Sequence, residues 1–307
     1  MKTAIVTGAN GFIGSKLVNK LVEKNYKVYA IIKDQKENIS HIENSKNVKI
    51  IYCGLNEINK LNELIDEESI DIFFHLAWAG VSTTFKNNFD IQFENVKFAY
   101  NAICSAESLH CKKFVSTGSA SECAYATKMI NGRNLPSPSD LYSVSKISAR
   151  YYSMIFAKQH HMEFNWCLIT SLYGPGRKDN NILTYAITSL LKNESPNFTK
   201  LEQKWNYIYI DDLINALYLI GEKGKNMETY AVGSYENKPL STYIKQIATI
   251  INPDIKLNIG AVPYKTNRID NSIMDITKLH NDTGFVPQIN FEEGIRKTIE
   301  YYKEKNN

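Results

Sequence analysis

The sequence predicts an α/β fold, a doubly wound parallel sheet with a second, smaller α/β lobe. Two observations lead to this prediction. Short apolar runs alternate with helical patterns through the first half of the chain, which is typical of βαβ units in a parallel sheet covered on both faces. At 307 residues the chain is also long enough to bury a large core and to carry a further lobe.

The first element is an apolar strand that runs directly into a glycine-rich turn, within Thr3–Gly14. Its three glycines are spaced G-x-x-G-x-x-G, and an amphipathic helix pattern follows. A helix N-terminus offers unpaired backbone N–H groups to a pyrophosphate, and glycines let the phosphate approach. The turn therefore predicts a dinucleotide-binding (Rossmann) domain. The residues expected at the cofactor are Gly8, Asn10, Gly11, Phe12, Ile13 and Gly14.

Further strands and two long helices complete the predicted first domain. The expected strands are Ala4–Val6, Val28–Ile32, Val48–Tyr52, Ile72–Leu76, Phe114–Val115 and Trp166–Ile169. The long amphipathic helices are expected at Phe89–Ser108 and Leu141–Gln159, and Ser139 or Asp140 could cap the second one. We assign residues 1–170 to this domain.

The strict alternation stops after the segment that ends at Arg177. Helices are expected at Asp212–Ile220, at Leu240–Ile251 and near Phe291–Lys303. We assign residues 171–307 to the smaller, substrate-binding lobe. Segments near residues 205–232 are expected to return to the first domain.

Composition narrows the function classes. Lys and Arg exceed Asp and Glu by 36 to 32 without any basic block, which argues against nucleic acid and suits a small anionic ligand. The sequence has neither an apolar run of membrane length nor a leader pattern, so we expect no membrane partner and a cytoplasmic protein. Five cysteines without a C-x-x-C pair argue against a disulfide framework and against a metal site.

Tyr142 and Lys146 are the candidate catalytic pair. Four residues apart on a helix, they project from one face, and a lysine cation near a phenol is expected to lower its pKa from the usual value of roughly 10. The expected strand that begins at Phe114 delivers hydroxyls, including that of Ser119, to the carboxyl end of the sheet.

Together these elements resemble the extended short-chain dehydrogenase/reductase family, in its nucleotide-sugar epimerase and 4-ketoreductase branch. The resemblance covers nearly the whole chain and rests on Thr7–Gly14, His75–Ala77, Glu94–Val96, the Ser119 segment, Tyr142 with Lys146, Leu172–Gly176, Tyr207–Asp212 and Asp275–Lys278. It implies that Ser119 hydrogen-bonds the reacting sugar oxygen, Tyr142 is the acid/base, and Lys146 holds the nicotinamide ribose. It also implies that Leu76, Ala77 and Asn95 lie at the cofactor, and that the protein is a homodimer built by its two long helices.

Departures from the family pattern narrow the reaction. Sugar 4,6-dehydratases of this family carry Asp-Glu directly after the catalytic hydroxyl residue, whereas this chain has Ala120 and Ser121, with Glu122 one position late. We therefore disfavour a dehydratase. Two further departures, Cys123 for a tyrosine and Ser171 for an asparagine, fall at substrate-contacting positions.

The end of the second strand favours NADP(H) over NAD(H). The acidic residue that binds an NAD ribose is replaced by Ile32, with Lys33 next, so a 2′-phosphate meets a cation, although Asp34 is close. Gly54 replaces the acidic residue used for adenine, which leaves the backbone of Leu55 for that contact.

Other residues have both a functional and a structural interpretation. His75 is expected to be a packed core histidine, while Trp78 and Trp205 could stack on a ligand or simply pack. Arg177 and Arg268 could clamp a diphosphate or lie on solvated surface.

The leading hypothesis is NADPH-dependent reduction of a nucleotide-linked 4-keto (deoxy)sugar for surface polysaccharides. Substrate contacts are expected from Ser119, Ser171, Arg177 and Arg268. One alternative is a nucleotide-sugar 4-epimerase that retains NAD; others are a reductase of a non-nucleotide carbonyl and a non-catalytic NADP-binding sensor module.

Overall fold

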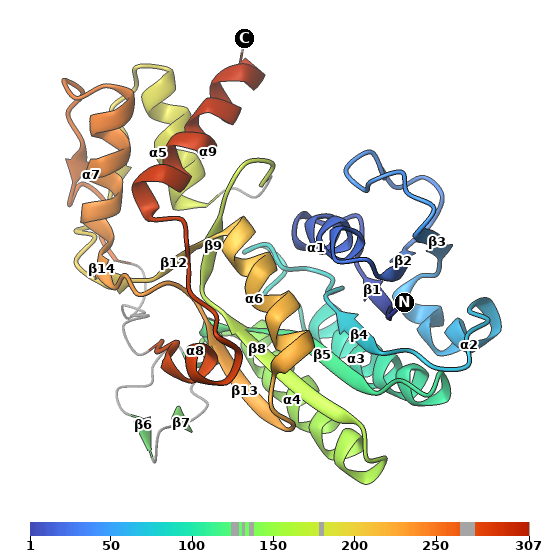
Figure 1. Cartoon of the computed structure of the whole chain (residues 1–307). Helices are drawn as coiled ribbons and strands as arrows, with labels where there is room; N and C mark the ends of the chain where they lie inside the picture. Colours follow the sequence, from blue (N-terminus) through green and yellow to red (C-terminus); the bar gives the residue numbers. More distant parts are fainter. Residues whose placement is uncertain (124–128, 131–132, 135–137, 178–180, 265–273, 307) are drawn as a thin grey trace.

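The computed structural model (Figure 1) describes residues 1–123, 129–130, 133–134, 138–177, 181–264 and 274–306. Its central sheet has seven strands in the order β13-β8-β5-β4-β1-β2-β3, and all neighbouring strands are parallel. The strands are β1 Thr3–Thr7, β2 Lys27–Ile32, β3 Val48–Tyr52, β4 Ile72–His75, β5 Lys113–Ser119, β8 Glu163–Ile169 and β13 Glu228–Val232. The predicted doubly wound parallel sheet is confirmed.

Helices cover both faces of this sheet, which explains why its inner strands are almost continuously apolar. On one face, α1 (Phe12–Glu23) packs against α6 (Ile210–Lys223). On the other face, α3 (Phe89–Ser108) packs against α4 (Leu141–Gln159), and both helices have the predicted bounds. Asp140 caps α4, since its carboxylate accepts a hydrogen bond from the backbone N–H of Ser143 at 2.8 Å.

Shorter elements join these layers. They are η1 Leu55–Lys60, α2 Leu61–Leu64, η2 Ala120–Cys123, β6 Met129–Ile130 and β7 Arg133–Asn134. The 3-10 turn η1 contacts α3, so it lies on the same side of the sheet as α3 and α4.

The second lobe is built by three helices that pack on one another, and Figure 1 shows them side by side, away from β1, β2 and β3. They are α5 Ile182–Leu191, α7 Leu240–Ile251 and α9 Phe291–Asn306. Short strand pairs complete the lobe: β9 Ser171–Tyr173 with β12 Tyr207–Tyr209, β10 Asn197–Phe198 with β15 Asn258–Ile259, and β11 Lys204–Trp205 with β14 Lys238–Pro239. A short helix, α8 (Thr277–Thr283), packs against β13 and α6. The predicted smaller α/β lobe is present.

The chain crosses between the two parts at neighbouring points near Thr170, Asn206 and Gly233. The buried amide of Asn206 donates to the carbonyl oxygens of Ser234 and Glu236 and accepts from the backbone N–H of Ser234. A Cβ at Gly233 would lie 2.5 Å from the Asn206 amide oxygen, so only glycine fits there. Because β13 ends directly before the third crossing point and pairs with β8, chain from the second half completes the central sheet. The boundary at residues 170 and 171 stays a prediction.

Three composition-based expectations concern features of the described residues. No helix there is both long and apolar enough to cross a lipid bilayer. All five cysteines are free thiols, four of them buried. In the same ranges, His, Cys, Asp and Glu side chains form no group of three or more that could hold a metal ion.

Candidate active site

The glycine turn after β1 is shaped for close approach. Gly8 has φ of +66°, and a Cβ there would lie 3.1 Å from the Cα of Ala77. A Cβ at Gly14 would lie 2.1 Å from the carbonyl oxygen of Gly8, so the turn packs against the first turn of α1 only because no side chain is present. Gly11 precedes α1, and no side chain caps the exposed N–H groups of that helix.

These features fit a dinucleotide. An uncapped helix N-terminus without acidic residues in its first turn leaves backbone N–H groups for a pyrophosphate. Asn10, Phe12 and Ile13, also predicted at the cofactor, are partly exposed around this turn. The predicted placement of the glycine turn at the carboxyl end of β1 is therefore found, while its cofactor contacts stay a prediction.

Thr7 and His75 connect the glycine turn to the loop after β4. The Thr7 hydroxyl accepts from the backbone N–H groups of Leu76 (3.1 Å) and Ala77 (3.2 Å), so its own proton points to Nδ1 of His75 at 3.0 Å. His75 therefore accepts at Nδ1 and is neutral, and burial lowers its pKa to about 3. The predicted core role of His75 agrees with this arrangement.

Two buried amides of α3 hold the loop that follows Ala77. Asn95 accepts from the backbone N–H of Ala79 and donates to the Ala79 carbonyl, each at 2.9 Å. Gln92 donates to the carbonyls of Gly80 and Phe85 and accepts from the Trp78 indole N–H. Asn95 was expected near the cofactor, but its amide hydrogens are used within the protein. The Asn95 side chain fixes the shape of the loop, and its place at the cofactor stays a prediction.

Ser119 and Tyr142 meet where β5 ends and α4 begins. The Ser119 hydroxyl accepts from the backbone N–H of Ser121 (3.2 Å) and from its hydroxyl (2.8 Å). The Ser119 proton is thus free to donate, and its hydrogen bond to the Tyr142 phenol lowers the pKa of Tyr142. Tyr142 is anchored in turn by its backbone N–H, which donates to the Lys86 carbonyl at 2.8 Å.

Two hydrogen bonds hold the loop before α3 against the first turn of α4. The Lys86 carbonyl accepts from the backbone N–H of Tyr142, and the Asn87 side chain accepts from the backbone N–H of Leu141 at 3.1 Å. The Lys86 ammonium lies 5.1 Å from the centre of the Tyr142 ring. Nothing in the sequence pattern indicated this neighbour, since Lys86 lies far from Tyr142 along the chain and in a loop.

Lys146 is buried beside this pair. Its ammonium donates to the Thr117 carbonyl at 2.8 Å and lies 3.7 Å from the centre of the Trp78 ring and 5.8 Å from that of Tyr142. Burial lowers the pKa of Lys146 to about 7, while the negative charge of Glu122 acts in the opposite direction.

The expected lowering of the Tyr142 pKa by Lys146 is wrong for this structure. Burial raises the pKa of Tyr142, the charge of Glu122 raises it further, and only the Ser119 hydrogen bond acts downward among the side-chain contacts. The reason is geometric: the Lys146 ammonium bonds the Thr117 carbonyl and faces the Trp78 ring. Tyr142 is therefore a protonated phenol at neutral pH.

The end of β2 carries groups of both charges. Ile32 is buried and Lys33, directly after the strand, is exposed, as the NADP(H) prediction requires. Sequence reasoning missed Glu37, whose carboxylate accepts from the side-chain amide of Asn10 at 3.1 Å. An acidic group thus reaches the glycine turn from the same loop. Leu55 begins the turn after Gly54 and is partly buried.

The predicted substrate residues of the second lobe are only partly brought together. The Ser171 hydroxyl accepts from the Trp205 indole N–H at 2.8 Å, and the Arg177 guanidinium donates to the Leu172 carbonyl. Both residues therefore lie along β9 and the turn after it. Arg268 lies outside the described residues.

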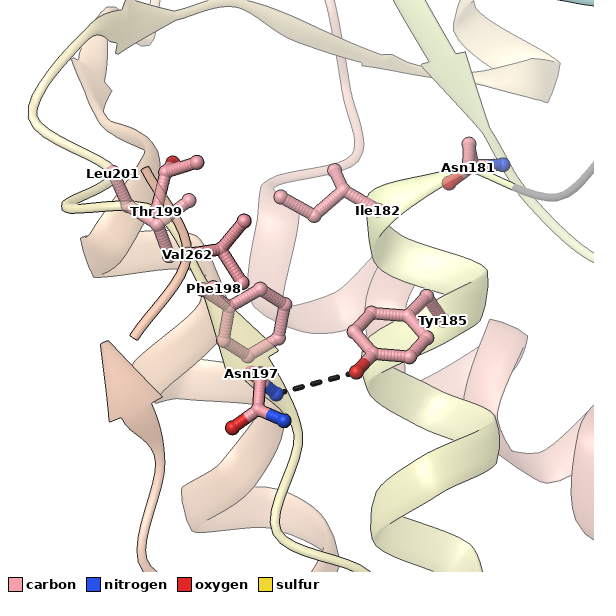
Figure 2. Close-up of a pocket in the computed structure, with 8 residues that line it drawn as sticks. All are labelled: Asn181, Ile182, Tyr185, Asn197, Phe198, Thr199, Leu201 and Val262. Carbon is pink, nitrogen blue, oxygen red and sulfur yellow. Dashed lines mark hydrogen bonds between the residues drawn. The ribbon is translucent and has the colours of Figure 1, made fainter. Parts of the chain in front are cut away.

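A pocket of about 360 Å³ opens where α5 begins, close in sequence to Arg177 (Figure 2). The rings of Tyr185 and Phe198 meet there edge to face, 5.6 Å apart, and the backbone N–H of Asn197 donates to the Tyr185 hydroxyl at 3.2 Å. Sequence reasoning did not identify this pocket, because its walls come from α5, β10 and the loop that holds Val262.

Comparison with known proteins assigns the family. The sequence pattern of the NAD dependent epimerase/dehydratase family matches residues 4–233. The chain belongs to this family. Family members that resemble it include the dTDP-D-glucose 4,6-dehydratase of Bos taurus, which is 26% identical over 320 residues, 99% of this chain and 89% of the relative. The CDP-abequose synthase of Yersinia pseudotuberculosis is 26% identical over 274 residues, 86% of this chain and 89% of the relative.

Solved structures of epimerases share the fold. The UDP-glucose 4-epimerase of Thermotoga maritima, solved with UDP-glucose, superposes with a TM-score of 0.85 at 22% identity and covers 99% of this chain and all of its own. The UDP-glucuronic acid 4-epimerase of Bacillus cereus, solved with UDP-glucuronic acid and NAD, gives 0.84 at 23% identity with the same coverage. These structures show the shared fold, and because the family is described by both activities, epimerase and dehydratase, membership alone leaves the reaction open.

Within this family, the residues after Ser119 distinguish the chain. Ala120 is buried, the Ser121 hydroxyl bonds that of Ser119, and the Glu122 carboxylate is fully buried. In the described segment 119–123, no carboxylate faces the Ser119 hydroxyl. The arrangement can deliver a proton from Tyr142, and within residues 119–123 no further acid/base side chain faces the Ser119 hydroxyl.

Proposed function

We propose that the protein reduces the keto group of a nucleotide-linked 4-keto (deoxy)sugar with NADPH. One observation carries the proposal: Ser119, Tyr142 and Lys146 lie together, while Ala120 and Ser121 supply no acid/base for water elimination. A carbonyl reduction needs one proton donor at the oxygen, and this group of side chains has one.

The protonation states suit the reductive direction. Tyr142 is protonated at neutral pH, so it can give its proton to the carbonyl oxygen as negative charge develops there. The Ser119 hydroxyl, whose proton goes to the Tyr142 phenol in this structure, can turn to donate that proton to the same oxygen. A bound nicotinamide would supply the hydride. The Lys146 ammonium lies 5.8 Å from the centre of the Tyr142 ring, and we propose that it binds a ribose hydroxyl of the cofactor.

The cofactor preference rests on the loop after β2. Lys33 is exposed directly after β2, and we propose that it pairs with the 2′-phosphate of NADP(H). Glu37 acts against it, because its carboxylate contacts Asn10 of the glycine turn and would repel a phosphate there. Besides Lys33, the residues proposed to hold the cofactor are Gly8, Gly11, Gly14, Leu55, Leu76 and Ala77.

The pocket at α5 is the proposed place of the nucleoside. Its two aromatic rings offer stacking surface for a planar base, and the side-chain amide of Asn197 can pair with the base edge. The two epimerase structures that share this fold were solved with UDP-glucose and with UDP-glucuronic acid. Ser171 and Arg177, in and after β9, are proposed to lie between this pocket and Tyr142.

A 4-epimerase that retains NAD is the second candidate, favoured by the epimerase structures that share the fold and by Glu37. The two reactions differ in cofactor use. An epimerase isolates with tightly held NAD and consumes none, whereas a reductase oxidises NADPH in proportion to product. A non-catalytic sensor would bind the cofactor and turn over nothing.

In the test, the purified protein is mixed with NADPH and, in separate reactions, with UDP-, dTDP- or CDP-linked 4-keto-6-deoxyglucose. Absorbance follows the loss of NADPH, and NMR identifies the sugar product. Reduction of at least one substrate with equal loss of NADPH is the expected result. Interconversion of UDP-sugars without added cofactor would instead support the epimerase. Neither activity, in protein that binds NADPH, would support the sensor.

A homodimer is proposed from the outer face of α3 and α4. Large apolar side chains there are exposed, including Phe89 at 63%, Phe93 at 59%, Tyr152 at 59% and Ile155 at 53%. Two neighbouring helices with such a face can pack on a second copy as a four-helix bundle.

A further inference from the structure

Glu122 has no part in the proton transfer proposed above, yet it is fully buried directly beneath it. One carboxylate oxygen, Oε1, accepts from the backbone N–H of Ser119 at 3.0 Å and from the Trp166 indole N–H at 3.1 Å. The carboxylate therefore fixes the backbone of the residue whose hydroxyl bonds Tyr142, and it ties that backbone to β8.

The second carboxylate oxygen faces α4. It lies 3.4 Å from the Arg150 guanidinium, and both side chains are almost fully buried. Arg150 follows Lys146 by four residues, just as Lys146 follows Tyr142, so all three project from one face of the helix. Glu122 thus links the strand that carries Ser119 to the helix face that carries Tyr142 and Lys146.

Gly118 shows how closely this link is packed. A Cβ at position 118 would lie 2.1 Å from the Trp166 indole nitrogen and 2.3 Å from Oε1 of Glu122. Any side chain there would displace the carboxylate from the Ser119 backbone. Glycine at position 118 thus leaves the space in which Glu122 and Trp166 form their hydrogen bond.

We propose that Glu122 is a positioning residue of this active site: its ionised carboxylate, paired with Arg150, sets Ser119 against α4 and holds a negative charge beside the helix face that carries Lys146. The inference rests on the proposed function for the roles of Ser119 and Lys146. The charged and titratable groups that face Glu122 are Arg150, Lys146 and Tyr142 on α4 and Cys123 beside it on η2.

The direction of each interaction follows from charge. The carboxylate raises the pKa of Lys146 against the effect of burial, and it also raises that of Tyr142. Burial raises the pKa of Glu122 itself, and the Arg150 cation acts against burial in favour of the ionised carboxylate. Because Lys146 has its pKa near 7, its charge at neutral pH is sensitive to the loss of one neighbouring charge.

The experiment follows the titration of Lys146 by NMR in the full chain with ¹³C-labelled lysine, the signal being assigned by its loss in Lys146→Met. In Glu122→Gln, the Lys146 midpoint is expected to fall by about one pH unit. Glu122→Asp retains the charge and should keep the midpoint near that of the wild type. Glu122→Asp should still lower kcat, with little change in the KM for the sugar, because the shorter side chain loses its hydrogen bond from the Ser119 backbone N–H.

Asp212→Asn is the matched control. Asp212 is also a buried carboxylate that accepts two backbone N–H groups, those of Gln288 and Ile289, but it lies on α6. Its variant is expected to lose stability and to keep the Lys146 midpoint. If Glu122→Gln fails to fold, the double variant Glu122→Gln/Arg150→Gln replaces it, because the double variant leaves no unpaired buried charge.

An unchanged titration midpoint of Lys146 in folded Glu122→Gln would overturn the proposal, and so would a full kcat in the double variant, which lacks the carboxylate that holds the Ser119 backbone. A full kcat in Glu122→Asp would overturn its positioning half. The NMR titration of Lys146 needs no substrate. It therefore tests the role of Glu122 even if the protein reduces no 4-keto sugar.

Discussion

The ammonium of Lys146 lies over the indole face of Trp78, 3.7 Å from the ring centre. The indole N–H donates to the Gln92 side chain at 3.0 Å, and the indole ring meets that of Tyr142 edge to face at 6.0 Å. A cation over an aromatic face is stabilised by the negative charge of the π-system. Trp78 therefore partly offsets the burial that lowers the pKa of Lys146.

Trp78→Leu should lower the pKa of Lys146 below 7, because the cation loses its aromatic partner. A contact of about 0.5–2 kcal/mol corresponds to roughly 0.4–1.5 pH units. Activity at pH 7.5 should fall and recover toward pH 6, where the lysine is protonated again. Trp78→Phe, which keeps a ring face, should retain the wild-type pH profile. An identical profile for all three proteins would exclude this role.

Tyr142→Phe removes only the phenol hydroxyl, so turnover should fall by roughly 10²- to 10⁴-fold while cofactor binding remains. Steady-state kinetics and a cofactor titration measure the two effects. Tyr152→Phe, on the exposed face of the same helix, is the control and should leave the rate unchanged. Unchanged turnover in Tyr142→Phe would show that this tyrosine is not the acid.

Lys33→Ala should weaken NADPH binding ten- to over a hundred-fold, or about 1.5–3 kcal/mol, and leave NADH binding unchanged. Glu37→Gln should have the opposite effect on NADPH, since it removes a carboxylate beside Asn10. Isothermal titration with both cofactors measures these changes, with Lys36→Ala as an exposed control from the same loop. A strong preference of the wild type for NADH would contradict the proposed cofactor.

His75 should make the fold less stable in acid. Its pKa is about 3 in the folded chain and about 6.5 when unfolded, so only the unfolded state takes up a proton between these values. Stability from this group is full above pH 6.5 and is lost as the pH falls toward 3. Between pH 7 and pH 5 the wild type should lose about 2 kcal/mol more than His75→Asn in urea unfolding. Equal losses in the two proteins would show that His75 is protonated in the folded state.

Tyr152→Glu should dissociate the proposed dimer, because one substitution on a twofold interface places two charges against apolar surface. Sedimentation should report about twice 35.0 kDa for the wild type and a single chain for the variant. Tyr235→Glu, also at an exposed tyrosine but outside α3 and α4, is the control. A wild-type monomer with full activity would exclude the four-helix bundle.

The sequence predicted elements that local patterns define. The bounds of α3 and α4 follow from long amphipathic periodicity, and Asp140 caps α4 as one of two expected residues. The glycine turn after β1 was also predicted, since its spacing reflects a close approach that only glycine permits. Such features depend on residues that are neighbours in the sequence.

Features that depend on burial or on distant contacts were missed. The spacing of Tyr142 and Lys146 placed both on one helix face, but it could not show that burial raises the tyrosine pKa. Glu122 was noted only as lying one position late, because its partners Trp166 and Arg150 come from other elements. The α5 pocket was missed for the same reason.

The position of β13 at the edge of the central sheet has a consequence for how the protein is made. This strand pairs with β8, yet the whole of α5 and α6 separates the two along the chain. As the ribosome releases the polypeptide, β8 therefore has one unpaired edge until Val232 has emerged. During that interval the nascent chain exposes the edge of an apolar strand, and such an edge is a template for pairing with other chains.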